Sequence, residues 1–252
     1  MTRIAIIGTG YVGLTSGACF AHLGHEVVCG DIDEKRIAQL SAGEVPFLED
    51  GLGDLVLGGI SSGRLRFVHG AKAAVTACEI AFLCVPTPQK DDGSADLSFI
   101  EIATLDIAEV LPEGAILVNK STVPVGSTTV VEQVLGRDDV IVVSNPEFLR
   151  EGSAVQDFLH PDRVVIGAED RVAAKAVAAL YEPVGAPMLV TDPASAETIK
   201  YAANAFLATK LSFVNAIAAV CEGVGADVSD VMSGLGYDSR IGSEFLRPGP
   251  GW

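Results

Sequence analysis

Basic residues are scarce in this chain of 252 residues. Only 17 lysines and arginines stand against 33 aspartates and glutamates, so the formal net charge at pH 7 is −16. A protein that binds nucleic acid normally carries a basic surface, and this composition does not provide one. We therefore expect no nucleic-acid partner, and we expect any anionic ligand to be held by helix N-termini and a few local cations.

Long apolar runs and a leader pattern are also missing. No uninterrupted apolar run approaches the ~20 residues that cross a bilayer. The N-terminus has the pattern of a strand, without the basic and then apolar segments of a signal peptide. The chain is 49% hydrophobic, which is enough to bury a substantial core. We expect a globular, cytoplasmic protein with no membrane partner.

The five cysteines form no C-x-x-C pair. Each of them lies in an apolar segment: Cys19, Cys29, Cys78, Cys84 and Cys221. This spacing matches no common metal or redox motif, so we expect no bound metal. It predicts buried, reduced thiols of the kind found in a reducing compartment.

The N-terminal segment carries the most informative motif, Ile4-Ala5-Ile6-Ile7-Gly8-Thr9-Gly10-Tyr11-Val12-Gly13. An apolar run, three glycines at G-x-G-x-x-G spacing and an Ala/Ser/Gly-rich helical stretch predict a strand, a turn and a helix that bind a dinucleotide. Gly8 permits the sharp turn, and Gly10 lets the backbone approach a pyrophosphate. Gly13 lets the helix pack on the strand. Glycines at this spacing also form ordinary turns, so the motif needs support from its surroundings.

The next predicted strand, 26–30, supplies that support because it ends at Asp31. A carboxylate at this place accepts hydrogen bonds from a ribose 2′-hydroxyl and repels a 2′-phosphate, which favours NAD over NADP. Arg36 lies in the helix that follows. It either faces solvent or reaches the adenosine phosphates.

Strand and helix patterns alternate as far as residue 192. Apolar runs at 65–68, 80–85, 115–119, 140–143, 163–166 and 187–190 predict further strands. This alternation predicts an α/β fold, with a Rossmann-like doubly wound parallel sheet covered by helices on both faces. We assign residues 1–192 to this domain.

From residue 193 the pattern changes to one long helix that reaches residue 224. Its length exceeds that of an ordinary globular helix, so we expect it to open a second, all-α domain at 193–252. The apolar face with Leu211, Val214 and Ile217 requires a partner helix, either from this chain or from another subunit.

Polar side chains follow three of the predicted strands, at the edge where ligands bind in such sheets. They are Thr87, Ser121 with Thr122, and Glu147 with Glu151. Hydroxyls there suit a nicotinamide or a reacting alcohol, and the glutamates suit a proton acceptor and a cofactor contact. Each residue also has an interpretation without function. Thr87 lies between two prolines, which can simply end a strand, and exposed glutamates usually have no functional role.

Lys200 and Asn204 lie one turn apart on the long helix. An ammonium beside a carboxamide can stabilise an oxyanion. The alternative is a solvent-facing pair without a function.

Taken in order, these segments resemble the UDP-glucose 6-dehydrogenase family of nucleotide-sugar dehydrogenases. The resemblance runs through the glycine loop and through the segments 85–88, 120–126, 145–152, 161–167, 200–206, 240–242 and 248–252. It implies an enzyme that oxidises the C6 alcohol of UDP-glucose to a carboxylate. The oxidation uses two hydride transfers to NAD and passes through an aldehyde and a cysteine thioester, in a homodimer joined by the long helix.

The same resemblance implies a set of site residues. Implied cofactor contacts are Gly8, Gly10, Tyr11, Val12, Gly13, Asp31, Arg36, Thr87, Thr122 and Glu151. Implied substrate contacts are Glu147, Phe148, Leu149, Arg150, Glu151, Lys200, Asn204, Arg240, Phe245 and Arg247, with Arg240 reaching a sugar bound by the neighbouring subunit. Thr122 and Glu147 serve proton transfer with water, and Lys200 and Asn204 stabilise the oxyanion.

One departure from the family pattern concerns the nucleophile. In the family the turn at 248–252 continues into a Gly-Gly-Ser-Cys segment, and none of the five cysteines here occupies that position. A thioester requires a thiolate beside the aldehyde, so we interpret the chain as an N-terminal portion that binds NAD without forming a uronate by itself. Two alternatives stay open: a dehydrogenase of GDP-mannose or a UDP-N-acetyl-hexosamine, and a catalytically silent module for NAD binding or dimerisation.

Overall fold

The structure is a computed structural model that describes residues 1–251. The chain separates into two compact units, Met1–Thr198 and Ile199–Trp252. Each unit is described by itself below. The domain boundary expected after residue 192 stays a prediction.

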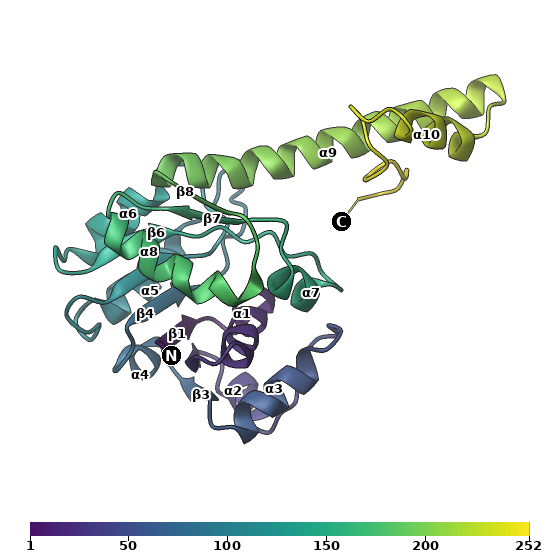
Figure 1. Cartoon of the computed structure of the whole chain (residues 1–252). Coiled ribbons are helices and arrows are strands. Elements are labelled where there is room, and N and C mark those ends of the chain that lie inside the picture. Colours follow the sequence, from purple (N-terminus) through teal and green to yellow (C-terminus); the bar gives the residue numbers. More distant parts are fainter. Residues whose placement is uncertain (252) are drawn as a thin grey trace. The chain divides into compact units, whose positions relative to one another are not determined.

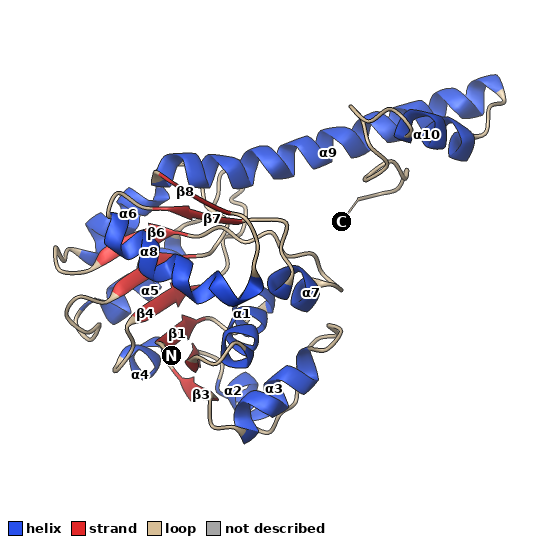
Figure 2. Ribbon diagram, viewed as in Figure 1, coloured by secondary structure: helices blue, strands red, loops and turns tan. Residues whose placement is uncertain are grey.

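Eight strands of the first unit form one sheet in the order β3-β2-β1-β4-β5-β6-β7-β8 (Figures 1 and 2). The strands are β1 (Arg3–Ile7), β2 (Glu26–Asp31), β3 (Leu65–His69), β4 (Ile80–Leu83), β5 (Ile116–Asn119), β6 (Ile141–Ser144), β7 (Val164–Gly167) and β8 (Met188–Thr191). The strands from β1 to β6 are parallel. The strand order reverses between β1 and β4, which creates the switch point where doubly wound sheets bind ligands.

The last two strands depart from the expected parallel arrangement. β7 pairs antiparallel with β6 through Ser144 and Gly167, and β8 runs parallel to β7. Between β6 and β7 lies a short helix, α7 (Ala154–Leu159), which the sequence analysis did not predict. The loop before α7 is bound at the carboxyl edge of the sheet by buried contacts of Glu49. Because β7 runs antiparallel to β6, it enters the sheet from that same edge.

Helices cover both faces of the sheet, as predicted. One hydrophobic core holds α1 (Tyr11–His22), α2 (Glu34–Ser41), α3 (Leu52–Ser61), α7 and α8 (Arg171–Tyr181) against the sheet. A second core holds α4 (Ala71–Val75), α5 (Ser98–Ala108) and α6 (Ser127–Leu135) on the other face. A short 3-10 helix, η1 (Glu182–Val184), follows α8. Because side chains alternate along a strand, Phe82 joins the first core and Leu83 the second.

The helix α9 (Pro193–Val224) begins in the first unit and continues through the second, followed by α10 (Val228–Gly236). A small core of Val214, Met232 and Leu246 holds the second unit together. The Asn215 amide also fixes the closing turn, because it donates to the Gly249 carbonyl at 2.8 Å and accepts from the Gly249 N–H at 2.9 Å.

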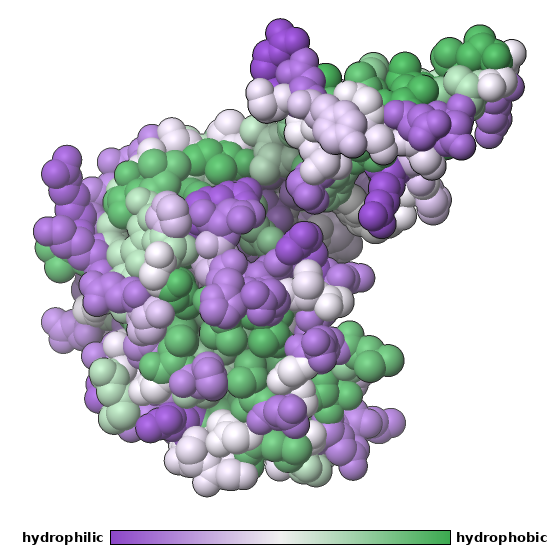
Figure 3. Space-filling view, turned by 45° about the vertical axis from the view of Figure 1, so that its right-hand side comes forward, coloured by the Kyte–Doolittle hydropathy of each residue, from purple (hydrophilic) through white to green (hydrophobic). Residues whose placement is uncertain are grey.

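Large apolar side chains are exposed on α9. Phe206, Phe213 and Val220, spaced seven residues apart, are each more than half exposed, and apolar side chains show on the surface of this part of the chain (Figure 3). By length and composition alone α9 is also apolar enough to cross a membrane, because an 18-residue stretch of it has a mean hydropathy of 1.4. A helix that is covered by a partner protein has the same properties. The expected homodimer and the expected absence of a membrane partner therefore stay predictions.

The cysteines lie where their apolar setting predicted. All five are buried and unpaired. Burial raises the pKa of Cys78 to about 11 and the pKa values of Cys19 and Cys84 to about 12. Within residues 1–251 no cluster of three His, Cys, Asp or Glu side chains is arranged to hold a metal ion.

Candidate functional site

The loop between β1 and α1 lies beside the switch point of the sheet. Gly8 has a φ of +96°, and a Cβ on it would lie 2.6 Å from the Cys84 carbonyl oxygen. A Cβ on Gly13 would lie 2.0 Å from the Gly8 carbonyl oxygen. The protein's own backbone therefore excludes side chains at both positions, in agreement with the turn and packing roles predicted for them.

Gly10 has a different reason to be glycine. Its backbone is extended, with φ −67° and ψ −171°, a conformation that any residue adopts, and an added Cβ would meet no atom within 4 Å. Folding therefore does not require glycine here. No side chain caps the N-terminus of α1, whose first N–H groups lack intrahelical partners. The open space beside Gly10 fits a diphosphate held by those N–H groups.

Asp31 closes the other side of this loop. Its Oδ2 accepts the Thr9 N–H at 2.7 Å and the Thr9 hydroxyl at 2.6 Å, and its Oδ1 accepts the Asp33 N–H at 3.1 Å. Burial acts to raise the pKa of Asp31, but these hydrogen bonds and Arg36 outweigh it and hold the pKa below its usual value. Oδ1 keeps capacity to accept from a ribose hydroxyl. Arg36 lies nearby, with Nη1 3.9 Å from Oδ2.

The loops after β4 and β5 are tied to each other. The Thr87 hydroxyl donates to the Thr122 carbonyl at 2.7 Å, and the Ser121 hydroxyl donates to the Val85 carbonyl at 2.7 Å. The structure thus brings together Thr87 and Thr122, which the sequence placed in one site. Because the proton of the Thr87 hydroxyl is used by this bond, its oxygen can offer only an acceptor to any further group.

Glu197, near the start of α9, fixes the loop that carries Thr122. This buried carboxylate accepts the Gly126 N–H at 2.6 Å through Oε2. Its Oε1 accepts the Thr128 N–H at 2.9 Å and the Thr128 hydroxyl at 2.7 Å. Glu197 therefore caps α6 and anchors the start of α9 to the loop after β5.

Substitution of Glu197 by glutamine tests this anchor. The amide keeps one acceptor oxygen and places an NH₂ donor against a buried N–H, so we expect the free energy of unfolding to fall by about 2–4 kcal/mol. Thermal and urea unfolding followed by circular dichroism measure it. Glu222→Gln is the matched control, because Glu222 is exposed on the same helix and should change stability by less than ~0.5 kcal/mol. Equal losses in the two variants would contradict the assigned role.

Charged side chains, within the loop after β6 and in the segments that follow it, hold this loop in place. Glu147 accepts the Leu149 N–H at 2.6 Å, and the Arg163 guanidinium lies 3.7 Å from the centroid of the Phe148 ring. Arg150 donates to Asp157 of α7, with Nε 3.1 Å from Oδ2. Glu151 is exposed beside these contacts.

The second unit carries the remaining expected site residues. Lys200 and Asn204 lie one turn apart on α9, as predicted, with Lys200 buried and Asn204 exposed. Arg240 pairs with Asp238, with Nε 3.0 Å from Oδ1, and Arg247 is exposed. Phe245 has a φ of +59°, a strained conformation for a non-glycine residue that often marks a functional position. The convergence of these residues with Thr122 and Glu147 stays a prediction.

Several polar residues of the site were missed by sequence reasoning. Buried contacts around it are made by Thr9, Glu49, Lys120, Asn145 and Glu197. Lys120, at the end of β5, lies with its Nζ 3.2 Å from both Asn145 Oδ1 and the Tyr181 hydroxyl. The sequence offers one signal that could have predicted Lys120 and Asn145 as site residues: each directly follows an apolar strand, at the carboxyl edge where such sheets bind ligands.

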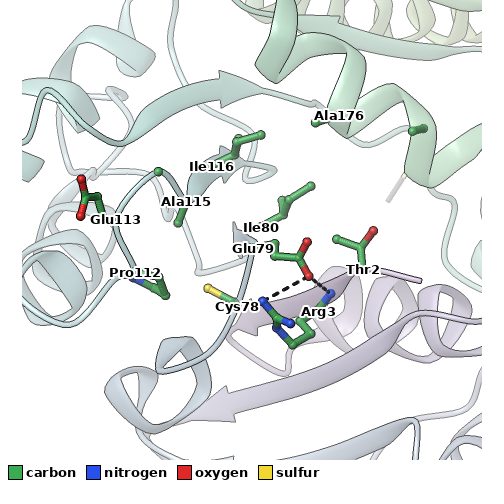
Figure 4. A pocket seen from close by; sticks show the side chains of 12 residues that line it. Thr2, Arg3, Cys78, Glu79, Ile80, Pro112, Glu113, Ala115, Ile116 and Ala176 are labelled. Carbon is green, nitrogen blue, oxygen red and sulfur yellow. Dashed lines mark hydrogen bonds and ion pairs between the residues drawn. The ribbon is translucent and has the colours of Figure 1, made fainter.

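A pocket also opens at the opposite, amino edge of the sheet (Figure 4). Residues at the starts of β1, β4 and β5 line it, including Arg3, Ile80 and Ile116. The carboxylate of Glu79 in this pocket pairs with the Arg3 guanidinium at 3.5 Å. None of the predicted site residues lines this pocket.

Comparison with known proteins identifies the family. The model of the NAD binding domain of the UDP-glucose/GDP-mannose dehydrogenase family matches residues 2–185, and the model of its central domain matches residues 194–252. The chain belongs to this family. Membership in the UDP-glucose/GDP-mannose dehydrogenase family confirms NAD as the cofactor that the glycine loop and Asp31 predicted.

Relatives in this family match the chain over its length. It is 50% identical to the UDP-glucose 6-dehydrogenase TuaD of Bacillus subtilis, covering 100% of this chain and 56% of that protein. It is 48% identical to the UDP-glucose 6-dehydrogenase of Rhizobium meliloti, over 99% of this chain and 60% of that protein. The chain therefore spans little more than half the length of these relatives.

Solved structures confirm the predicted fold. A UDP-glucose dehydrogenase from Pyrobaculum islandicum superposes with a TM-score of 0.95 at 41% identity, covering 100% of this chain and 60% of that one. A GDP-mannose dehydrogenase from Pseudomonas aeruginosa superposes with a TM-score of 0.90 at 33% identity, over 98% of this chain and 60% of that one.

Proposed function

We propose that this chain is the NAD-binding portion, with the start of the central domain, of an NAD-dependent UDP-glucose 6-dehydrogenase that forms UDP-glucuronate. The observation that carries the proposal is the open space at Gly10 beside the carboxylate of Asp31, in a chain 50% identical to an enzyme of that name. NAD, when bound, accepts hydride from the sugar C6. A homodimer joined through α9 and a cytoplasmic location belong to the same proposal.

The cofactor contacts follow from the loop geometry. The N–H groups of Tyr11, Val12 and Gly13 open α1 and suit the pyrophosphate, and Asp31 suits the adenosine ribose. Arg36, which lies close to Asp31, supplies a cation toward the phosphates. Thr87, Thr122 and Glu151, on the loops after β4, β5 and β6, face the nicotinamide end in this proposal.

The substrate contacts are proposed for the loop after β6 and for the second unit. Glu147, with water and Thr122, accepts the proton that leaves the C6 hydroxyl when hydride departs. Lys200 and Asn204 stabilise the oxygen anion that develops at C6. The remaining proposed contacts to the sugar nucleotide come from Phe148, Leu149, Arg150, Glu151, Arg240, Phe245 and Arg247.

A second candidate, oxidation of GDP-mannose, is favoured by the superposition on a GDP-mannose dehydrogenase. The higher identity to UDP-glucose 6-dehydrogenases favours UDP-glucose. A UDP-N-acetyl-hexosamine is the third possible substrate, and a module that binds only NAD is the alternative from another class.

Calorimetry separates these candidates. The chain, first saturated with NAD, is titrated with UDP-glucose, GDP-mannose and UDP-N-acetylglucosamine in separate runs. We expect UDP-glucose to bind at least ~10-fold more tightly than the other two, which corresponds to ~1.4 kcal/mol. Tighter binding of GDP-mannose would overturn the choice of substrate. Heat from NAD without heat from any sugar nucleotide would identify a pure cofactor module.

A further inference from the structure

Glu49 joins two loops that lie far apart in the sequence. It precedes α3, and its buried carboxylate contacts Tyr11, 38 residues away, and Ala154, 105 residues away. Oε2 lies 2.6 Å from the Tyr11 hydroxyl and accepts the Gly152 N–H at 2.9 Å, and Oε1 accepts the Ala154 N–H at 2.7 Å. One buried carboxylate thus meets donors from the first residue of α1 and from the loop before α7.

The chemistry of these contacts requires a carboxylate. The Gly152 and Ala154 N–H groups can only donate, one to each oxygen, so both oxygens must accept, and hydrogen bonds to an ionised acceptor are stronger than neutral ones. An amide of the same shape would turn an NH₂ group toward at least one of these donors. Burial, and next the hydrogen bond to Glu49, raise the pKa of Tyr11, so its phenol keeps its proton even in alkaline solution where a free tyrosine ionises.

Tyr11 connects this carboxylate to the cofactor loop. It follows Gly10 directly, its ring packs on Phe47 with centroids 5.4 Å apart, and its hydroxyl also lies 2.7 Å from the Arg150 carbonyl oxygen. A diphosphate bound at the start of α1 would fix the Tyr11 backbone. Asp157 also binds the loop after β6, through hydrogen bonds from Arg150, but it belongs to the helix that directly follows this loop.

We propose that Glu49 is a positioning residue that couples NAD binding at the glycine loop to the order of the loop after β6. That loop carries Glu147 and Glu151, and the identity of the ligand rests on the proposed function. Coupling between two sites is reciprocal, so the order of the loop also strengthens NAD binding. Glu49 thereby helps to assemble the catalytic loop when the cofactor is present.

Hydrogen exchange measured by mass spectrometry, with and without NAD, tests the coupling in the full chain. We expect NAD to slow exchange of the amides in 147–156 by about 5- to 20-fold in the unsubstituted chain. The Asp50→Asn control should behave in the same way, because Asp50 is exposed beside Glu49 and its substitution removes an equal charge. Glu49→Gln should exchange faster at Gly152 and Ala154 without NAD, lose the slowing by NAD, and bind NAD about 5- to 20-fold more weakly.

Tyr11→Phe separates coupling from simple capping of α7. It removes the hydroxyl, with its contacts to Glu49 and to the Arg150 carbonyl oxygen, and leaves the hydrogen bonds that Gly152 and Ala154 donate to Glu49. Exchange of these two amides without NAD should therefore stay unchanged while the slowing by NAD disappears. Full slowing in Tyr11→Phe would overturn the proposal. This variant also carries the test if Glu49→Gln fails to fold, as judged by thermal unfolding.

If the chain binds no NAD, both the proposed function and the proposed coupling are wrong. Hydrogen exchange without cofactor would then still test whether Glu49 positions the loop after β6. Faster exchange at Gly152 and Ala154 in Glu49→Gln would support Glu49 as a positioning residue, and unchanged exchange would overturn that role.

Discussion

Substitution of Gly10 by valine is expected to weaken NAD binding by at least ~100-fold, or ~2.7 kcal/mol, while the fold survives. A Cβ at Gly10 meets no protein atom within 4 Å, and the backbone there is extended, so valine fits the folded chain. Its branched side chain would fill the space proposed for the pyrophosphate. The loss of glycine at the N-cap should cost about 1 kcal/mol of stability.

Two comparisons make this prediction specific. Gly53→Val is the matched control, because a Cβ on Gly53 in α3 also meets no atom within 4 Å, and NAD affinity should stay unchanged. Gly13→Ala should fail in a different way, by unfolding at lower temperature, because its Cβ would lie 2.0 Å from a carbonyl oxygen. Unchanged NAD affinity in Gly10→Val, measured by calorimetry, would contradict the assignment of this loop.

Asp31→Asn is expected to lower NAD affinity by about 100-fold and to abolish the preference for NAD over NADP. The amide cannot accept both Thr9 donors without turning its NH₂ group toward another donor. It also removes the charge that repels a 2′-phosphate and leaves Arg36, 3.9 Å away, to attract one. Titrations with NAD and NADP measure both effects. Glu34→Gln, an exposed change nearby, is the control, and an unchanged ratio of the two affinities in Asp31→Asn would contradict the role.

The pH dependence of stability provides a second readout for Asp31. The pKa of Asp31 in the folded chain lies below its usual value, so its stabilising contribution is complete above the unfolded pKa of about 3.9 and is lost as the pH falls through the folded pKa. The difference in unfolding free energy between the unsubstituted chain and Asp31→Asn should therefore be constant from about pH 6 to 8 and shrink below about pH 4. Urea unfolding at several pH values measures this difference.

The sequence predicted the features that depend on local pattern. The roles of Gly8 and Gly13 follow from spacing along a single strand, turn and helix, and the structure agrees with both. Asp31 ends the next strand, as predicted, and its contact with a ribose stays a prediction. The long helix was predicted for the same reason, because α9 keeps one periodicity over 32 residues.

The features that sequence reasoning missed depend on contacts between distant segments. Glu49 binds Ala154 across 105 residues and Glu197 binds Thr128 across 69, and no local periodicity reports such a partner. The direction of β7 was missed because four apolar residues have the same pattern in a parallel or an antiparallel strand. The helix α7, with six residues, is too short to show a helical period.

Calorimetric titration of the 252-residue chain with NAD and, separately, with NADP tests the central claim most directly. The claim is that the N–H groups opening α1 and the carboxylate of Asp31 form an NAD site. We predict one NAD bound per chain with a dissociation constant in the micromolar range, and NADP bound at least ~50-fold more weakly. Absence of NAD binding, or equal affinity for the two dinucleotides, would contradict the claim.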